Sequence, residues 1–380
     1  MKITGIDTFI VDTGKRNMCF VKVKTDQDLY GIGEAYSVGP DRATEKTIDY
    51  FEEWLRGMDP MDIEGIWQKL YIGSRFPGGS VVNSAISGID HALWDLKGRA
   101  LNTPVYQLLG GRCRNRIRVY QNPGGSNPEE TAANAQQLIE TYGFTAIKTN
   151  PLPPEVSEMP WPKVLKWVDN KMALLRKSLG DKIDIGLDPH AQIFEPAKAI
   201  DLCSVVAPYR PMFVEEPVRP ENVDAMAYVR SKSHVPVATG EMLYTKWEFR
   251  DLLKVKAADI IQPDICCCGG VTEMKKIAAL AEVEYVTIAP HNPMGPVATA
   301  VNAQFASTAP NFVILEYKVD TESPRKDLVE EPYRIADGYL ELPEKPGFGI
   351  ELNEEYFKDH PYKAWKRHIP STPDGSVPFI

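Results

Sequence analysis

The sequence predicts an α/β protein built on a closed (β/α)8 barrel, a TIM-type barrel, that is capped by a smaller α+β domain. Eight short strand-like runs follow position 113, each with a helical stretch after it: residues 117–121, 146–148, 183–188, 212–215, 235–241, 260–264, 286–291 and 312–316. Strands that alternate with helices form parallel sheets, and eight such units can close into a barrel. An open nucleotide-binding sheet is the alternative, but its usual glycine-rich motifs do not occur. The barrel is therefore favoured.

Residues 1–113 predict the capping domain. Three runs have strand-like composition, with turn signals between them: residues 2–11, 19–24 and 29–34. From Ser84 onward, apolar residues recur at spacings of three and four, which predicts an amphipathic helix. His91 on that helix is expected to be structural. The barrel would span residues 114–318, and residues 319–380 are expected to fold back onto the N-terminal strands.

Length and composition restrict the function. With 380 residues, 43% of them apolar and 25% charged, and a mean hydropathy of -0.28, the chain matches soluble globular proteins that bury a large core. The net charge of -9 and the scattered Lys and Arg argue against nucleic acid as a partner. Asp7 and Asp12 interrupt the N-terminal apolar stretch, and no long apolar run follows. We expect a cytoplasmic protein that does not bind membranes.

The six cysteines are too sparse for a disulfide scaffold. Cys266, Cys267 and Cys268 are consecutive, and neighbours in an extended segment alternate faces, so the three thiols cannot hold one zinc ion. We expect them to be buried at a strand end without a chemical role.

An ionisable residue ends each of the last six predicted strands. These residues recur about every 23 to 27 positions, which corresponds to one strand and helix: Asp188, Glu215, Glu241, Asp264, His291 and Glu316. The C-terminal ends of barrel strands meet at one mouth, where active sites are built. We therefore expect five carboxyl groups and one imidazole to converge on a single pocket.

The first three of these residues predict a cation site. Asp188, Glu215 and Glu241 offer only hard oxygen ligands, which suit Mg²⁺ better than zinc or copper. Bare carboxylates at this spacing would repel and raise one another's pKa, so a structural cluster would need a Lys or Arg partner at each. We expect one Mg²⁺ per subunit.

Asp264 and His291 end neighbouring strands and could therefore contact each other. A carboxylate beside an imidazole sets its tautomer and raises its basicity, as a general base near neutral pH requires. A neutral core histidine is the alternative. His190 lies two residues after Asp188, so the alternation of an extended strand predicts a second acid or base in the same mouth.

Three further polar residues lie beside these strand ends. Lys148 is the only cation in the set, and Asn150 is expected on its face. Glu216 follows Glu215 and is expected to point away and to pair with a Lys or Arg. Residues 151–163 hold five prolines and predict a stiff, non-helical loop. That loop and residues 13–19 and 73–79 could cover the mouth and set selectivity.

Seven segments, in this order, resemble the enolase superfamily, in its mandelate racemase subgroup, and within it the galactonate-dehydratase-like acid-sugar dehydratases. They are SAISGIDHALWDLKGRALNTPVYQLLGG (84–111), GLDPHA (186–191), FVEEP (213–217), TGE (239–241), QPD with GGVTEMKKIAALAE (262–282), APHNPMGP (289–296) and ILE (314–316). Each is modest alone, and together they span the chain.

The resemblance implies a role for each strand-end residue. Asp188, Glu215 and Glu241 match the Mg²⁺ ligands, and Asp264 with His291 matches the base. The remaining two matches are His190, as the second acid or base, and Glu316, as the acid beside a substrate carboxylate oxygen. This superfamily uses a Lys or His base with Mg²⁺.

One departure from the family pattern helps to choose between the possible reactions. The racemases of the subgroup have Lys-x-Lys on the second strand, whereas this chain has Lys148-Thr149-Asn150. Asn cannot take a proton, which counts against a racemase that needs two bases, although His190 could replace one.

We therefore expect a carbon-oxygen lyase, a Mg²⁺-dependent hydro-lyase. His291 would take the C2 proton of a galactonate-type aldonate and His190 would protonate the C3 hydroxyl, to give a 2-keto-3-deoxy sugar acid. Lys148 and Asn150 are expected to bind the substrate. The alternatives are a sugar-acid epimerase or cycloisomerase that forms the same enolate, and a weak family member that only binds a sugar acid. A homo-oligomer is expected.

Overall fold

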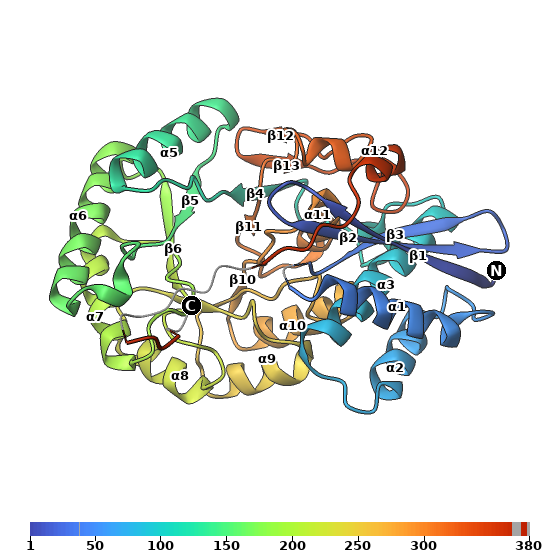
Figure 1. Cartoon of the computed structure of the whole chain (residues 1–380), viewed down its shortest axis with the longest axis horizontal. Coiled ribbons are helices and arrows are strands. Elements are labelled where there is room, and N and C mark those ends of the chain that lie inside the picture. The colour runs from blue at the N-terminus through green and yellow to red at the C-terminus, as the bar shows by residue number, and fades with distance from the viewer. Residues whose placement is uncertain (38, 367–373, 378–380) are drawn as a thin grey trace.

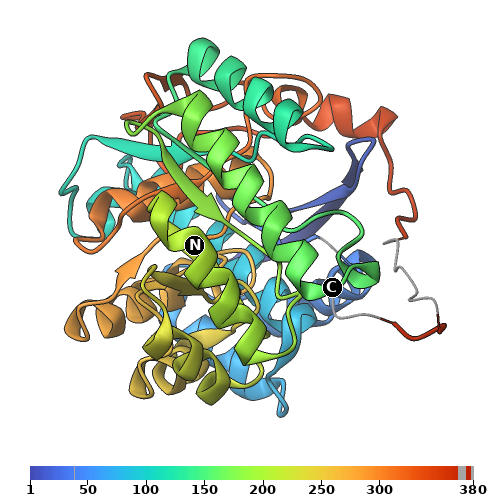
Figure 2. The same cartoon turned by 90° about the vertical axis from the view of Figure 1, so that its left-hand side faces the viewer.

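The computed structural model describes residues 1–37, 39–366 and 374–377. Figure 1 shows a barrel on one side and a smaller cap of strands and helices on the other. Figure 2 turns the helices of the barrel toward the viewer. The predicted barrel of eight parallel strands with an α+β cap is confirmed. No helix among the described residues is long and apolar enough to cross a bilayer.

Eight parallel strands form the barrel. They are β4 (Arg116–Tyr120), β5 (Ala146–Thr149), β6 (Asp184–Leu187), β7 (Phe213–Glu215), β8 (Val237–Thr239), β9 (Ile260–Ile261), β10 (Thr287–Ile288) and β11 (Leu315–Glu316). Strands β5 to β10 pair in chain order, and β11 pairs with β4. Single bridges from Gln121 to Ile147 and from Ile288 to Phe312 close the ring. Each strand overlaps the run that predicted it.

Seven helices follow the first seven strands of the barrel. They are α5 (Pro128–Tyr142), α6 (Trp161–Leu179), α7 (Pro196–Val206), α8 (Val223–Lys232), α9 (Thr245–Lys254), α10 (Gly270–Val283) and α11 (Pro296–Thr308). The prediction of an eighth barrel helix after β11 is wrong. After β11 the chain forms β12 (Ile335–Ala336) and β13 (Tyr339–Glu341), and β13 pairs with residues 116–118 of β4. These residues precede the part of β4 that pairs with β11. Strand β13 therefore pairs with backbone N–H and C=O groups of β4 that β11 does not reach.

Apolar side chains fill the barrel, which leaves its mouth for chemistry. One cluster takes residues from seven of the strands or their ends: Tyr120, Ala146, Phe213, Ala238, Ile260, Ala289 and Ile314. Strand β6 contributes Gly186 instead of an apolar side chain. A Cβ added to Gly186 would lie 2.9 Å from the ring of Phe213. The glycine makes room for that ring.

The cap is an antiparallel sheet packed on helices. Its strands are β1 (Ile3–Asp12), β2 (Asn17–Thr25) and β3 (Tyr30–Ala35), and its helices are α1 (Asp41–Leu55), α2 (Ile63–Gly73), α3 (Gly79–Ala100) and α4 (Val105–Leu108). The helix predicted from Ser84 is part of α3. Strand β3 approaches α3 so closely that a Cβ on Gly33 would lie 2.1 Å from the carbonyl oxygen of Gly88.

Buried polar contacts attach the cap to the barrel. Trp67 Nε1 donates to the carbonyl of Gly269 at 2.8 Å, and Glu34 accepts from the backbone N–H groups of Gly295 and Ala298. The ring of His91 lies 3.0 Å from the carbonyl oxygens of both Glu34 and Ile265. His91 therefore joins cap to barrel, in agreement with the structural role expected for it.

Part of the C-terminal segment, around α12 (Glu354–Asp359), packs on the cap. Phe357 of α12 stacks on Phe20, with ring centroids 5.2 Å apart, and Lys22 pairs with Glu354 at 2.6 Å. The backbone N–H of Asp12 donates to the carbonyl of His360. The domain boundaries at residues 113 and 318 stay a prediction.

Two local expectations are wrong. Helix α6 begins at Trp161, inside the segment expected to be non-helical, because Pro162 lies in its first turn, where a missing backbone N–H costs nothing. Cys266 to Cys268 form a turn rather than a strand end: the N–H groups of Cys267 and Cys268 both donate to the carbonyl of Asp264. The three thiols are buried and unpaired, as expected.

Candidate active site

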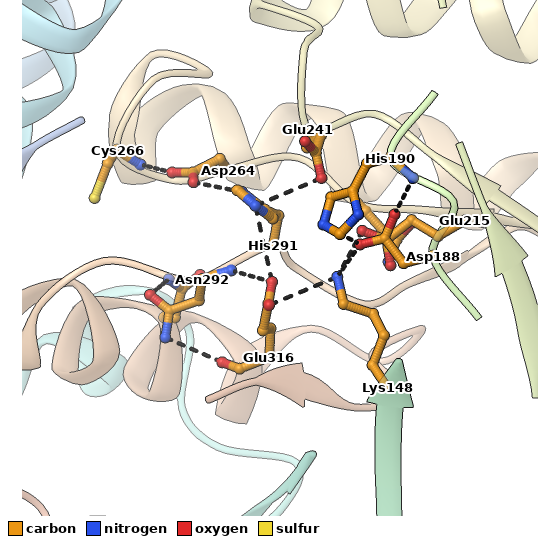
Figure 3. Close-up of polar contacts among 12 residues, drawn as sticks. Lys148, Asp188, His190, Glu215, Glu241, Asp264, Cys266, His291, Asn292 and Glu316 are labelled. Carbon is orange, nitrogen blue, oxygen red and sulfur yellow. Dashed lines mark hydrogen bonds and ion pairs between the residues drawn. The ribbon is translucent and has the colours of Figure 1, made fainter. Parts of the chain in front are cut away.

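Eight of the nine predicted site residues lie together at the C-terminal ends of the barrel strands. Figure 3 shows their side chains directed toward one another: Lys148, Asp188, His190, Glu215, Glu241, Asp264, His291 and Glu316. Each belongs to a strand or to the first residues after it. Since parallel barrel strands all end at one mouth, residues far apart in the chain meet there.

Three carboxylates form the centre of this cluster. Asp188, Glu215 and Glu241 each offer an oxygen, and these oxygens all lie within 4.8 Å of one another. Lys148 Nζ lies 2.8 Å from Glu215 Oε1 and 3.1 Å from Asp188 Oδ2. A single ammonium group thus faces two of the three carboxylates.

The electrostatics of the triad fit a divalent cation. Burial and the charge of Asp188 raise the pKa of Glu215 well above its usual value, although Lys148 opposes this. The Oε2 atom of the neighbouring Glu216 and the Oε1 atom of Gln262 are buried without a hydrogen-bond partner among the described residues. A hard cation held by oxygen ligands would offset this excess of negative charge, and Mg²⁺ matches the donor set.

Asp264 and His291 make the predicted contact. Asp264 Oδ2 lies 2.8 Å from His291 Nδ1, and its Oδ1 accepts the backbone N–H of Cys266 at 2.7 Å. Asp264 is therefore held from both sides and in turn orients the imidazole. His291 Nε2 faces Glu241 at 3.5 Å and Glu316 at 3.9 Å, in the space around the triad.

The charges around His291 and Glu316 act on each other. Burial disfavours the charged imidazole, but Glu241, Asp264 and Glu316 outweigh it and raise the pKa of His291 to about 10. Burial has the opposite effect on Glu316, where Lys148 and His291 outweigh it and lower the pKa to about 2. Both shifts favour the charged form, and a cation bound by Glu241 would offset part of the negative charge that raises the pKa of His291.

His190 reaches the site by a route that the sequence reading did not foresee. Its Nε2 lies 3.2 Å from Asp188 Oδ2, and its side chain is 46% exposed, so it can meet a ligand. The chain is not extended here: His190 and Ala191 have φ values of 52° and 55°, and the N–H of His190 donates to Asp188 Oδ1. A left-handed turn, and not strand alternation, places this imidazole beside the triad.

Glu216 differs from its expected pairing. Its Oε1 accepts from the Thr239 hydroxyl and from the N–H of Gly240 at 3.0 Å, and no described Lys or Arg forms an ion pair with it. Burial and the charge of Glu241 raise its pKa to about 8. Backbone and hydroxyl donors at the end of β8 replace the cation that the sequence led us to expect.

Asn150 lies apart from the other eight residues. Its Oδ1 accepts the N–H of Leu152 at 2.9 Å, and its carbonyl accepts from Lys171 Nζ at 2.8 Å. It lines a cavity of about 590 Å³ between the loops that follow β4, β5 and β6, and none of the eight residues lines that cavity. Its predicted role in substrate binding stays a prediction.

The sequence reading missed two contributors. Gln262 Nε2 donates to Glu215 Oε2 at 2.7 Å, and the N–H of Asn292 donates to Glu316 Oε2 at 3.2 Å. Gln262 precedes Asp264 by two positions, so the alternation of a strand end could have found it. Asn292 meets the Glu316 carboxylate through its backbone N–H, a contact that leaves no signal in the sequence, while its Nδ2 donates to the Glu316 carbonyl at 3.1 Å.

Comparison with known families accounts for most of the chain. Residues 4–110 match the N-terminal domain of mandelate racemase and muconate lactonizing enzyme, and residues 130–356 match the enolase C-terminal domain-like family. The D-galactonate dehydratase of Pectobacterium atrosepticum is 37% identical, with 99% of both chains covered.

Two crystal structures are also similar over almost the whole chain. An enolase from Agrobacterium radiobacter, a proposed galactarate dehydratase bound to sodium and L-malate, is 42% identical, with a TM-score of 0.96 and all of both chains covered. An enolase from Pantoea ananatis with bound D-gluconate and magnesium is 30% identical, with a TM-score of 0.92 and 99% of both chains covered.

Proposed function

Because this chain belongs to the enolase-like family of mandelate racemase and muconate lactonizing enzyme, we propose that it is a Mg²⁺-dependent acid-sugar dehydratase. The substrate is a galactonate-type acid, and the product is a 2-keto-3-deoxy sugar acid. The full-length similarity to D-galactonate dehydratases supports this reaction. The observation that carries the proposal is the Asp264–His291 contact of 2.8 Å beside three clustered carboxylates.

Asp188, Glu215 and Glu241 hold the cation in this proposal. When bound, Mg²⁺ supplies positive charge where a second negative charge develops on the substrate carboxylate. Lys148 adds a fixed positive charge at the same end, since its Nζ already lies between Asp188, Glu215 and Glu316. Glu316, oriented by the N–H of Asn292, donates a hydrogen bond to the substrate carboxylate in this proposal when it is protonated.

The two histidines move the protons. His291 Nε2 takes the C2 proton, because Asp264 occupies Nδ1 and stabilises the imidazolium that forms. His190 gives a proton to the C3 hydroxyl, so the C3–O bond breaks and water leaves. The resulting enol then takes up a proton at C3 and loses the proton of its C2 hydroxyl, which gives the 2-keto-3-deoxy acid, and one water is lost overall.

The proposal is tested by the variant His190→Asn in D₂O with galactonate. The base remains, so solvent deuterium should still enter at C2, whereas keto-acid formation should fall about 10²- to 10⁴-fold with the loss of the acid. The wild-type enzyme provides the reference for both rates.

An epimerase is the second candidate, because imidazoles on two different strand ends could remove and return a proton. A wild-type enzyme that inverts C2 of a sugar acid without releasing keto acid would favour that reaction and contradict the dehydratase. Binding without deuterium exchange would instead indicate a sugar-acid-binding protein. A cytoplasmic location and a homo-oligomer stay predictions from the sequence.

A further inference from the structure

The guanidinium of Arg16, a cation of the cap, forms no ion pair with another described residue. It lies in the turn between β1 and β2, at the barrel side of the cap in Figure 1. The turn is closed by Thr13, whose N–H and hydroxyl donate to the carbonyl of Arg16 at 3.0 and 2.6 Å. The side chain is half-buried, and its Nη2 atom is buried without a hydrogen-bond partner among the described residues. An unpaired guanidinium in such a place is unfavourable unless an anion joins it.

A second unpaired cation lies close to Arg16. Lys318 comes two residues after Glu316 and has no ion-pair partner in the described part of the chain. Its side chain is exposed, and partial desolvation together with the charges of Arg16 and Arg325 lowers its pKa to about 8. Arg325 is different, because Asp320 pairs with it at 2.7 Å. Among the described residues, Arg16 and Lys318 thus form no ion pair with a carboxylate.

These two cations lie within electrostatic range of the proposed reaction site. Glu316 contacts Lys148 at 3.6 Å, and its negative charge also acts on Arg16 and Lys318, where it opposes the burial that lowers both pKa values. Tyr36 lies between the same regions. Burial and the charge of Asp264 raise the pKa of its hydroxyl, and the charge of Arg16 opposes this. The N–H of Tyr36 donates to the carbonyl of Cys266. A sugar acid with its carboxylate at the triad could extend its other end toward this pair.

We propose that Arg16 and Lys318 bind a second carboxylate at the far end of the substrate, so that the preferred substrate is a sugar diacid, an aldarate. The inference rests on the proposed function and specifies its substrate class. An aldonate has a neutral hydroxymethyl group at the far end, which leaves both cations unpaired. A carboxylate there matches the planar fork of an Arg and removes the repulsion between the two cations.

The test compares kcat/KM for galactarate and galactonate, measured by keto-acid release. The wild-type enzyme should prefer galactarate by at least about 10-fold, the range expected of hydrogen bonds to a charged group. Arg16→Gln and Lys318→Gln should each lower kcat/KM for galactarate about 10- to 100-fold, mainly through KM, and reduce the preference. Arg16→Lys should retain part of the preference for galactarate, since Lys keeps the positive charge but lacks the planar guanidinium.

Lys15→Gln is the matched control, because Lys15 is an exposed cation in the same turn. It should leave the preference unchanged. Three outcomes would each overturn the inference but not the proposed dehydratase function. They are a wild-type preference for galactonate, an equal loss of kcat/KM for both acids in Arg16→Gln and Lys318→Gln, and an equal effect of Lys15→Gln. If Arg16→Gln does not fold, Lys318→Gln gives the same comparison. Keto acid from neither substrate would refute the proposed function itself.

Discussion

At the scale of single residues, proton transfer depends on how the imidazole of His291 is held. Asp264 contacts Nδ1, so only Nε2 faces the space around the triad. The N–H of Cys266 holds Asp264 in turn, and this backbone contact prevents the carboxylate from following a displaced ring. A positioned base of this kind typically contributes a factor of 10² to 10⁴ to a rate.

We predict that His291→Asn abolishes deuterium exchange at C2 of the substrate, because no other described imidazole contacts Asp264. Asp264→Asn should lower the exchange rate about 10²-fold or more, since the amide cannot stabilise the imidazolium. Exchange is followed by NMR in D₂O. An undiminished rate in His291→Asn would assign the base to another residue.

The second prediction at this scale concerns the cation. Glu241→Gln should weaken Mg²⁺ binding at least about 100-fold, because even groups that only support metal ligands change affinity 10- to 100-fold. Its side chain is 21% exposed, so the substitution should leave the fold intact. Calorimetric titration with Mg²⁺ measures the affinity, and circular dichroism checks the fold.

Glu284→Gln, an exposed carboxylate far along the chain from the triad, is the control and should bind Mg²⁺ as the wild type does. Full activity of the wild-type enzyme after treatment with EDTA would contradict the metal assignment.

At the scale of elements, the connection from β9 to α10 links the site to the cap. It contains Asp264 and the three cysteines, and α10 then starts at Gly270 with a φ of 76°. Asp90 of α3 accepts from the N–H and the hydroxyl of Thr272 in the first turn of α10. A carboxylate at a helix N-terminus also compensates the helix dipole. The position of Asp264 therefore depends on how closely α3 and α10 approach.

Gly270→Ala should destabilise this approach. The added Cβ would lie 2.4 Å from Asp90 Oδ2 in a conformation that favours glycine, so we expect a loss of about 1 to 3 kcal/mol in the free energy of unfolding. Chemical denaturation measures it. Gly65→Ala is the control, because an added Cβ there meets no atom within 4 Å. Equal stability of the two variants would contradict the close packing.

At the scale of the whole molecule, the two ends of the chain stabilise each other. The C-terminal segment leaves the barrel after β11, adds β13 to β4, and then contacts the first two strands of the cap through Phe357 and His360. The turn that carries Arg16 lies between those strands. Asn17, directly after it, donates to the carbonyl of Lys363, so the C-terminal segment also supports the turn.

Phe357→Ala should therefore lower the free energy of unfolding by about 3 kcal/mol or more, the usual cost of removing a buried phenyl ring. Thermal and denaturant unfolding, followed by tryptophan fluorescence, measure it. Glu355→Gln on the exposed side of the same helix should change little. Wild-type stability in Phe357→Ala would show that α12 does not support the cap.

The order of strands, the barrel class and most of the site could be read from the sequence alone. The reason is periodicity: an ionisable residue after each apolar run, one strand and helix apart, can only converge when the strands are parallel and share a mouth. The three carboxylates, Asp264 and His291 follow from that regular pattern.

Contacts that break the pattern were decided by the tertiary structure. Left-handed φ angles bring His190 to Asp188, backbone donors of β8 replace a cation at Glu216, and β13 takes the place of an eighth helix. Arg16 is the clearest case, since the burial of its Nη2 atom depends on how other elements pack around the β1–β2 turn. Local patterns report on neighbours in the chain, whereas desolvation and charge depend on every element that packs around a group.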